Sequence, residues 1–220
     1  MIVGSILLAF GIDAWWDERQ DREAEQEILS GLHEEFTRIA DGLQRAGALW
    51  DSSSVAIGNA LAAAESGGDL SLAQARASVR GVTFPNTFDP GSGVRDALIA
   101  SGRLELIRDS ELRNQLVAWD GVLREVQDNE IAGRAFILDH VIPYLSEHGA
   151  LVGGSNPRVP WTAVSEDEEL AAYSAILRDT EFFGLASTRY SYIAVSLFEY
   201  EATTEFVAGL LSLIEAQQHE

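Results

Sequence analysis

The sequence predicts an all-α protein in which an N-terminal membrane helix, able to run on into a long amphipathic helix, precedes a helical bundle. Three observations support this fold class. Apolar residues recur at spacings of three and four along most of the 220 residues, as on one face of a helix. No stretch alternates apolar and polar residues as a half-buried strand does. The first sixteen residues are also almost free of charge.

Residues 1–16 have the composition of a membrane anchor. The apolar run ends on Trp15 and Trp16, and the charged segment DERQDREAEQE follows directly. Tryptophan rings favour the headgroup level of a bilayer, whereas charged side chains need water. Asp13 lies within one turn of the Trp pair, where a carboxylate is tolerated as a snorkelling or capping residue. We therefore expect Asp13, Trp15 and Trp16 to mark a membrane interface.

This anchor is short. A helix from Ile2 to Trp16 is roughly 22 Å long, against a hydrocarbon core of about 30 Å. A helix that continues past the Trp pair through a thinned bilayer, or a start codon farther upstream, would each resolve the mismatch. A signal peptide would need a basic first segment and a small-residue cleavage site, and the sequence has neither. A buried core helix is the remaining alternative.

Small residues within the anchor predict a packing face. Gly4, Ser5, Ala9 and Gly11 lie along neighbouring faces of the helix. Small side chains let two helix backbones approach closely in lipid, so this face predicts a partner helix from another membrane protein. The alternative is that glycine and alanine are simply common in membrane helices.

The basic residues suggest a location. All fifteen are arginine, a usage typical of GC-rich bacteria, and Arg19 and Arg22 come directly after the Trp pair. No basic residue precedes the apolar run, so the positive-inside rule predicts a single-pass protein of the bacterial inner membrane with its large domain in the cytoplasm.

Residues 17–220 are predicted to form a single α-helical domain. The formal net charge of −20 argues against nucleic acid and against anionic lipid surfaces, and favours a partner with a basic surface. The chain has no cysteine, which excludes disulfides and thiolate metal sites.

The first half of this domain begins with a long amphipathic helix. The capping residues Asp51-Ser52-Ser53-Ser54 predict the end of this helix and the start of a second helix over 55–65. Asp69 or Ser71 can cap a third helix that runs to Arg80. Two prolines and several glycines then predict a loop near residues 81–93. The apolar face of the first helix consists of Ala24, Ile28, Leu32, Phe36, Ile39, Leu43, Ala46 and Trp50.

Helical patterns resume at Val94 and break at Gly102. Asp109 or Ser110 can cap the next helix, and a further helix over 131–145 contains Pro143, which kinks or ends it. A second loop is predicted near residues 149–160. Ser165 and the acidic residues after it have the composition of a capped helix start. The last helices are expected to run to Arg178 and from Thr180 or Gly184 to Glu215.

Three segments carry a resemblance to a known family. They are the Asp-Ala-Trp-Trp-Asp-Glu-Arg motif at 13–19 with Glu27-Ile28-Leu29 after it, the central run at 97–107 leading into 111–114, and the stretch from Phe182-Phe183-Gly184 to Arg189 with its trailing helix. The chain resembles uncharacterised bacterial single-pass membrane proteins described only as a domain of unknown function. This resemblance implies a membrane-anchored helical domain without an established activity. The chain departs from the family pattern by starting abruptly at the apolar run.

Motifs for catalysis or cofactor binding are missing. A di-iron bundle needs Glu-x-x-His pairs. The residues three positions before His33, His140 and His148 are instead Ser30, Ile137 and Leu145. No zinc-protease motif and no phosphate-binding loop occurs. Asp139-His140 and Glu147-His148 could hold a metal, although solvated or capping histidines are the commoner explanation. We therefore predict no catalytic residue, no metal ligand and no cofactor.

Two functional hypotheses remain. The first is a non-catalytic, membrane-anchored accessory or scaffold subunit that packs against a larger membrane protein complex, such as an energy-converting or transport assembly. The second is a membrane-tethered ligand-binding or sensory module, or an uncharacterised enzyme. A pocket with converging polar groups would favour the second hypothesis. A solid core, with exposed apolar residues only near the anchor, would favour the first.

Overall fold

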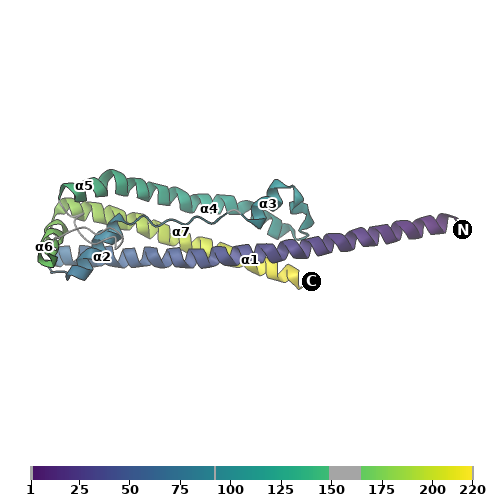
Figure 1. The fold of residues 1–220 in the computed structure, drawn as a ribbon, viewed down its shortest axis with the longest axis horizontal. Helices are drawn as coiled ribbons and strands as arrows, with labels where there is room; N and C mark the ends of the chain where they lie inside the picture. The colour runs from purple at the N-terminus through teal and green to yellow at the C-terminus, as the bar shows by residue number, and fades with distance from the viewer. Residues whose placement is uncertain (1, 92, 149–164, 220) are drawn as a thin grey trace. The chain divides into compact units, whose positions relative to one another are not determined.

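The computed structural model describes the backbone of residues 2–91, 93–148 and 165–219, and the side chains of these ranges from residue 11 onward. All regular elements there are helical, which confirms the all-α fold class. Figure 1 labels the α-helices and colours the chain by residue number. In chain order the elements are α1 (Ile2–Ser66), α2 (Leu72–Thr83), α3 (Val94–Ala100), the 3₁₀ helix η1 (Arg103–Leu106), α4 (Ser110–Phe136), the π-helical η2 (Ile137–Val141), α5 (Ile142–Glu147), α6 (Glu166–Leu177) and α7 (Thr180–Gln218).

The chain divides into two compact units. The first unit is drawn from residues 1–42, 89–122 and 204–220, and the second from residues 43–88 and 123–203. Helices α1, α4 and α7 each supply residues to both units. The single helical domain expected for residues 17–220 stays a prediction.

Helix α1 is continuous from the apolar run into the amphipathic stripe and beyond it. The break predicted at residues 51–54 is therefore wrong. Trp50, Ser53 and Ile57 are buried and extend the apolar stripe through the serine cluster, so packing outweighs the weak helix preference of serine. The helix ends where predicted, because Gly67 adopts the left-handed conformation (φ 68°) and the N–H of Gly68 bonds the carbonyl of Ala63 at 2.9 Å.

In the first unit, an aromatic chain joins three helices. Phe36 of α1 contacts Trp119 of α4 edge-on with 5.7 Å between ring centroids, and Trp119 stacks on Phe206 of α7 at 6.2 Å. Near the chain end, His33 Nε2 lies 3.3 Å from a Glu215 carboxylate oxygen. The C-terminal part of α7 is therefore fixed against α1. The buried apolar side chains around these contacts are Leu29, Leu32, Ile39, Leu98, Ile107, Leu112, Leu116, Val207, Leu210 and Ile214.

Two buried carboxylates of α1 hold the connecting segments of the first unit. Glu25 accepts a 2.6 Å bond from the backbone N–H of Arg108, and Glu35 accepts a 2.9 Å bond from that of Arg95. Both carboxylates are only 6% exposed. Helix α3 has no capping side chain of its own at Gly93, so Glu35 places a negative charge at its N-terminus.

In the second unit, α2 and α6 pack side by side (Figure 1). Both begin with capping boxes, at Ser71, one of the two caps proposed for α2, and at Ser165, where a capped start was expected. Arg76 of α2 donates two hydrogen bonds, of 2.9 and 2.6 Å, to the buried carboxylate of Glu169 on α6. The bond from Arg76 lowers the pKa of Glu169, and burial together with Glu169 raises the pKa of Tyr173 to about 12.

A polar cluster lies in the core of the second unit. The carboxylate of Glu130 accepts bonds from the backbone N–H of Phe88, at 2.9 and 3.1 Å, and from the Tyr200 hydroxyl. Arg189, 1% exposed, lies over the Trp50 ring at 4.9 Å and donates a 3.2 Å bond to the carbonyl of residue 84. Burial lowers the pKa of Arg189 to about 10. The segment 84–88 is therefore fixed to the helices at both ends.

The loop predicted near 81–93 begins later than expected, since α2 continues to Thr83. Gly81 is buried, and a Cβ atom there would lie 3.1 Å from the carbonyl oxygen of Ser53 on α1. This glycine therefore permits close helix packing and does not form a turn. Gly102 does form the expected break, with φ at 70°. The loop predicted near residues 149–160 lies outside the described residues.

The helix containing Pro143 shows how the chain accommodates the missing N–H. The π-helical turn η2 directly precedes α5, and the N–H of Ile142 bonds the carbonyl of Ile137. A π turn shifts the hydrogen-bond register by one residue, which allows a proline to follow without ending the helix. Of the two caps predicted for α4, Asp109 and Ser110, Asp109 is the one observed, because its carboxylate accepts a 2.6 Å bond from the N–H of Leu112.

The contact between Gly93 and Glu35 generates a stability prediction. A Cβ atom at Gly93 would lie 2.5 Å from a carboxylate oxygen of Glu35, and moving that carboxylate breaks its bond to Arg95. Gly93→Ala should therefore lower the free energy of unfolding by about 1–3 kcal/mol in urea denaturation. Gly91→Ala is the matched control, because a Cβ at Gly91 meets nothing within 4 Å. Equal effects of the two substitutions would contradict the proposed packing.

Candidate functional site

The predicted interface residues lie on an exposed part of α1. Every residue from Gly11 to Glu23 is exposed, and Figure 1 shows this end of α1 extending beyond the other helical segments of its unit. Trp15 and Trp16 are 57% and 62% exposed, and Ile12 is 56% exposed. Asp13 is exposed on the same stretch. The structure thus presents large apolar side chains to the surroundings of the first unit.

A band of charge follows the two tryptophans. Arg22 pairs with Glu18 at 2.9 Å and Arg19 pairs with Glu23 at 3.1 Å, both one helical turn apart. The Arg19 guanidinium also lies 5.9 Å from the Trp15 ring centroid. The hydrogen bond from Arg22 lowers the pKa of Glu18. Exposed pairs of this kind add little stability. They place charged side chains between the two tryptophans and the buried part of α1, which begins at Glu25.

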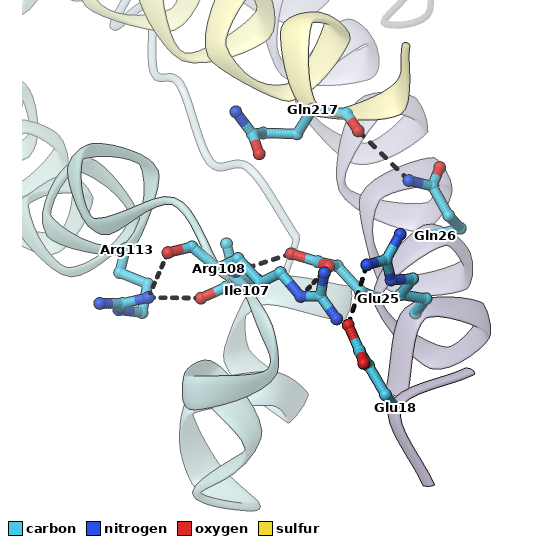
Figure 2. A network of polar contacts seen from close by, with 8 residues as sticks. Glu18, Glu25, Gln26, Ile107, Arg108, Arg113 and Gln217 are labelled. Atoms are coloured by element: carbon cyan, nitrogen blue, oxygen red, sulfur yellow. Dashed lines mark hydrogen bonds and ion pairs between the residues drawn. The ribbon is translucent and has the colours of Figure 1, made fainter. Parts of the chain in front are cut away.

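The exposed stretch ends at a polar network in the first unit. Figure 2 shows Arg108 beside Glu25, with the guanidinium Nε 3.4 Å from a carboxylate oxygen. Arg113 donates to the backbone carbonyls of Ile107 and Arg108 and so holds this turn together. On the other side, Gln26 donates a 3.2 Å bond to the carbonyl of Gln217. Helix α1 is therefore fixed to its unit from about residue 25 onward.

The predicted packing face is described only in part. The side chains of Gly4, Ser5 and Ala9 lie outside the described residues. Gly11 is exposed, and a Cβ atom there would meet nothing within 4 Å. Small-residue packing against a partner helix therefore stays a prediction.

The length and hydropathy of the helices bear on the predicted membrane helix. Within the described residues, no helix has a stretch both long enough and apolar enough to cross a membrane.

The histidines of the two acidic–histidine pairs contact neighbouring aromatic side chains. His140 lies beside the Phe136 ring with 5.3 Å between centroids. His148 stacks on Tyr144 at 4.1 Å, and its Nε2 is 3.9 Å from an Asp179 carboxylate oxygen. In the described part of the chain, no three His, Cys, Asp or Glu side chains come together as they would around a metal ion.

The sequence carries a signal for the buried glutamates of α1. Glu25 and Glu35 fall on the apolar stripe of α1, where a carboxylate is costly unless it is bonded. A glutamate on such a stripe therefore predicts a buried hydrogen-bond partner. The partners themselves, the N–H groups of Arg108 and Arg95, could not be identified because they are far away in the sequence.

Comparisons of the chain with protein-family models, with curated proteins and with solved structures found no match. The resemblance to uncharacterised single-pass membrane proteins therefore stays a prediction.

Proposed function

We propose that this protein is a non-catalytic accessory or scaffold subunit that is held at the bacterial inner membrane by the N-terminal part of α1. The observation that supports this proposal is the unbroken exposure of residues 11–23, with Ile12, Trp15 and Trp16 all more than half exposed. A concentrated apolar surface on a helical protein marks a site of association with another apolar surface.

The order of residues favours a lipid bilayer as that surface. Tryptophan pairs next to charged side chains are typical of the boundary between hydrocarbon and water. Arg19 and Arg22 on the aqueous side of Trp16 favour a cytoplasmic location of the helical units by the positive-inside rule. Because α1 continues into the core of the first unit at Glu25, the anchor and the folded part are joined by one helix.

The partner would be another membrane protein. The small residues Gly4, Ser5, Ala9 and Gly11 offer a close-packing face in a bilayer, where packing rather than burial from water drives helix association. The net charge of −20 favours a partner with a basic surface at the membrane face. An energy-converting or transport complex would supply both a transmembrane helix and such a surface.

A membrane-tethered ligand-binding or sensory module is the second candidate. It is favoured by a groove of about 460 Å³ in the second unit, lined partly by arginine, serine and asparagine side chains. This volume lies within the range of small-molecule sites. The second candidate is also favoured by large apolar side chains that are exposed outside the N-terminal part of α1, such as Phe198 at 72% and Ile131 at 65%.

Membrane attachment through the Trp pair can be measured by co-sedimentation of the full chain with phosphatidylcholine vesicles. Replacing Trp15 and Trp16 together by serine should weaken partitioning by about tenfold or more, because two large apolar side chains are lost. Phe198→Ser is the control, since Phe198 is 72% exposed but belongs to the second unit. Equal losses in both variants, or a wild-type chain that stays in the supernatant, would contradict attachment through this segment.

The partner can be sought by mild detergent extraction of native membranes, followed by mass spectrometry of co-purifying proteins. Ser5→Leu combined with Ala9→Leu should remove most of the co-purified partner while the chain remains in the membrane fraction, because larger side chains prevent close helix approach. Val3→Leu combined with Ile6→Leu serves as the control for apolar changes elsewhere on the helix. If the Ser5 and Ala9 substitutions leave co-purification unchanged, this face does not bind the partner.

A further inference from the structure

The groove between α1 and α2 in the second unit is built by one close contact and several small side chains. At Gly81 the two helices approach so closely that a Cβ atom would lie 3.1 Å from the Ser53 carbonyl oxygen. Beside this contact, Ala56, Ala73 and Ala77 leave room for a groove of about 460 Å³. The rest of its lining comes from Leu49, Ser52, Arg76, Arg80, Phe84 and Asn86.

The charge of the groove is opposite to that of the protein. The chain has 35 acidic and 15 basic residues, yet the described residues that line the groove include two arginines and no carboxylate. Arg76 is neutralised by its two bonds to Glu169. Arg80 lies over the Phe84 ring at 5.5 Å, and no carboxylate within the described ranges forms an ion pair with it. Arg80 is therefore the cation that remains for a ligand.

Asn86 gives independent evidence that the groove is a binding site. It is only 3% exposed and is the most buried polar side chain of the lining. Neither its amide nitrogen nor its amide oxygen has a hydrogen-bond partner in the part of the chain that the structure describes. A buried amide with both groups unpaired is costly, whereas a ligand with an acceptor and a donor would satisfy it.

We propose that this groove binds a small organic carboxylate that also carries a hydroxyl or amino group. The guanidinium of Arg80 would hold the carboxylate, since its planar donor fork matches two carboxylate oxygens. The hydroxyl or amino group would bond the amide of Asn86, and Ser53 belongs to the same lining. The alanines and the Phe84 ring provide an apolar wall for a short carbon chain.

This inference deepens the second candidate function and does not depend on membrane attachment. Calorimetric titration of the purified full chain with malate at constant ionic strength tests it, because malate carries both a carboxylate and a hydroxyl. Succinate is the matched probe without a hydroxyl, and inorganic phosphate is the probe for simple anion binding. Saturable binding of malate, tighter than that of succinate and of phosphate, is the expected result.

Two charge-matched variants locate the site. Arg80→Gln should weaken malate binding by about tenfold or more, the effect of losing one charge-assisted pair. Arg124→Gln removes another exposed arginine of the same unit and should leave binding unchanged. Equal weakening of malate binding in both variants would mean that only the net charge of the protein matters, and it would overturn the proposal. Absence of malate binding, or succinate binding as tight as that of malate, would also overturn it. The vesicle experiment tests membrane attachment separately, so the two proposals can fail independently.

Discussion

Buried glutamates that accept hydrogen bonds from backbone N–H groups are the interaction on which the connecting segments of this protein depend. In the first unit Glu25 and Glu35 bond the N–H groups of Arg108 and Arg95, and in the second unit Glu130 bonds that of Phe88. A carboxylate buried without partners costs several kcal/mol by desolvation, whereas bonds to a charged acceptor are worth about 1.5–3 kcal/mol each. Each contact therefore gives a buried helix carboxylate its hydrogen-bond partner. It also fixes the connecting segment, whose backbone N–H group would otherwise have no acceptor.

The arginines of the second unit differ in the partners that they have. Arg189 is buried against the Trp50 ring, and its low exposure explains the lowered pKa. Glu169 neutralises Arg76 and ties α2 to α6, which leaves Arg80, among the described residues of the lining, as the arginine without an ion pair. In an acidic chain most surface positions repel an anion. An unpaired arginine in the same groove as an unpaired buried amide therefore favours anion binding at this one position. The proposed carboxylate site therefore depends on the ion pair next to it.

The sequence predicted the helices well, because periodicity and local caps are short-range properties. The apolar stripe of α1, the caps at Ser71 and Ser165 and the break at Gly102 are all present. The break expected at residues 51–54 is wrong, since burial of Ser53 on the continuing stripe outweighs local propensity. The Trp pair is exposed, and its role at a membrane interface stays a prediction. The groove could not be predicted, because it requires the close approach of Gly81 to α1 and the juxtaposition of side chains from two helices.

Amide hydrogen exchange of the full chain, followed residue by residue by NMR, tests the central role of the buried glutamates most directly. The backbone amides of Phe88, Arg95 and Arg108 should exchange about tenfold to a hundredfold more slowly than the exposed amides of Thr87 and Gly91, because each is bonded to a buried carboxylate. Exchange of these three amides as fast as that of Thr87 and Gly91 would contradict the account.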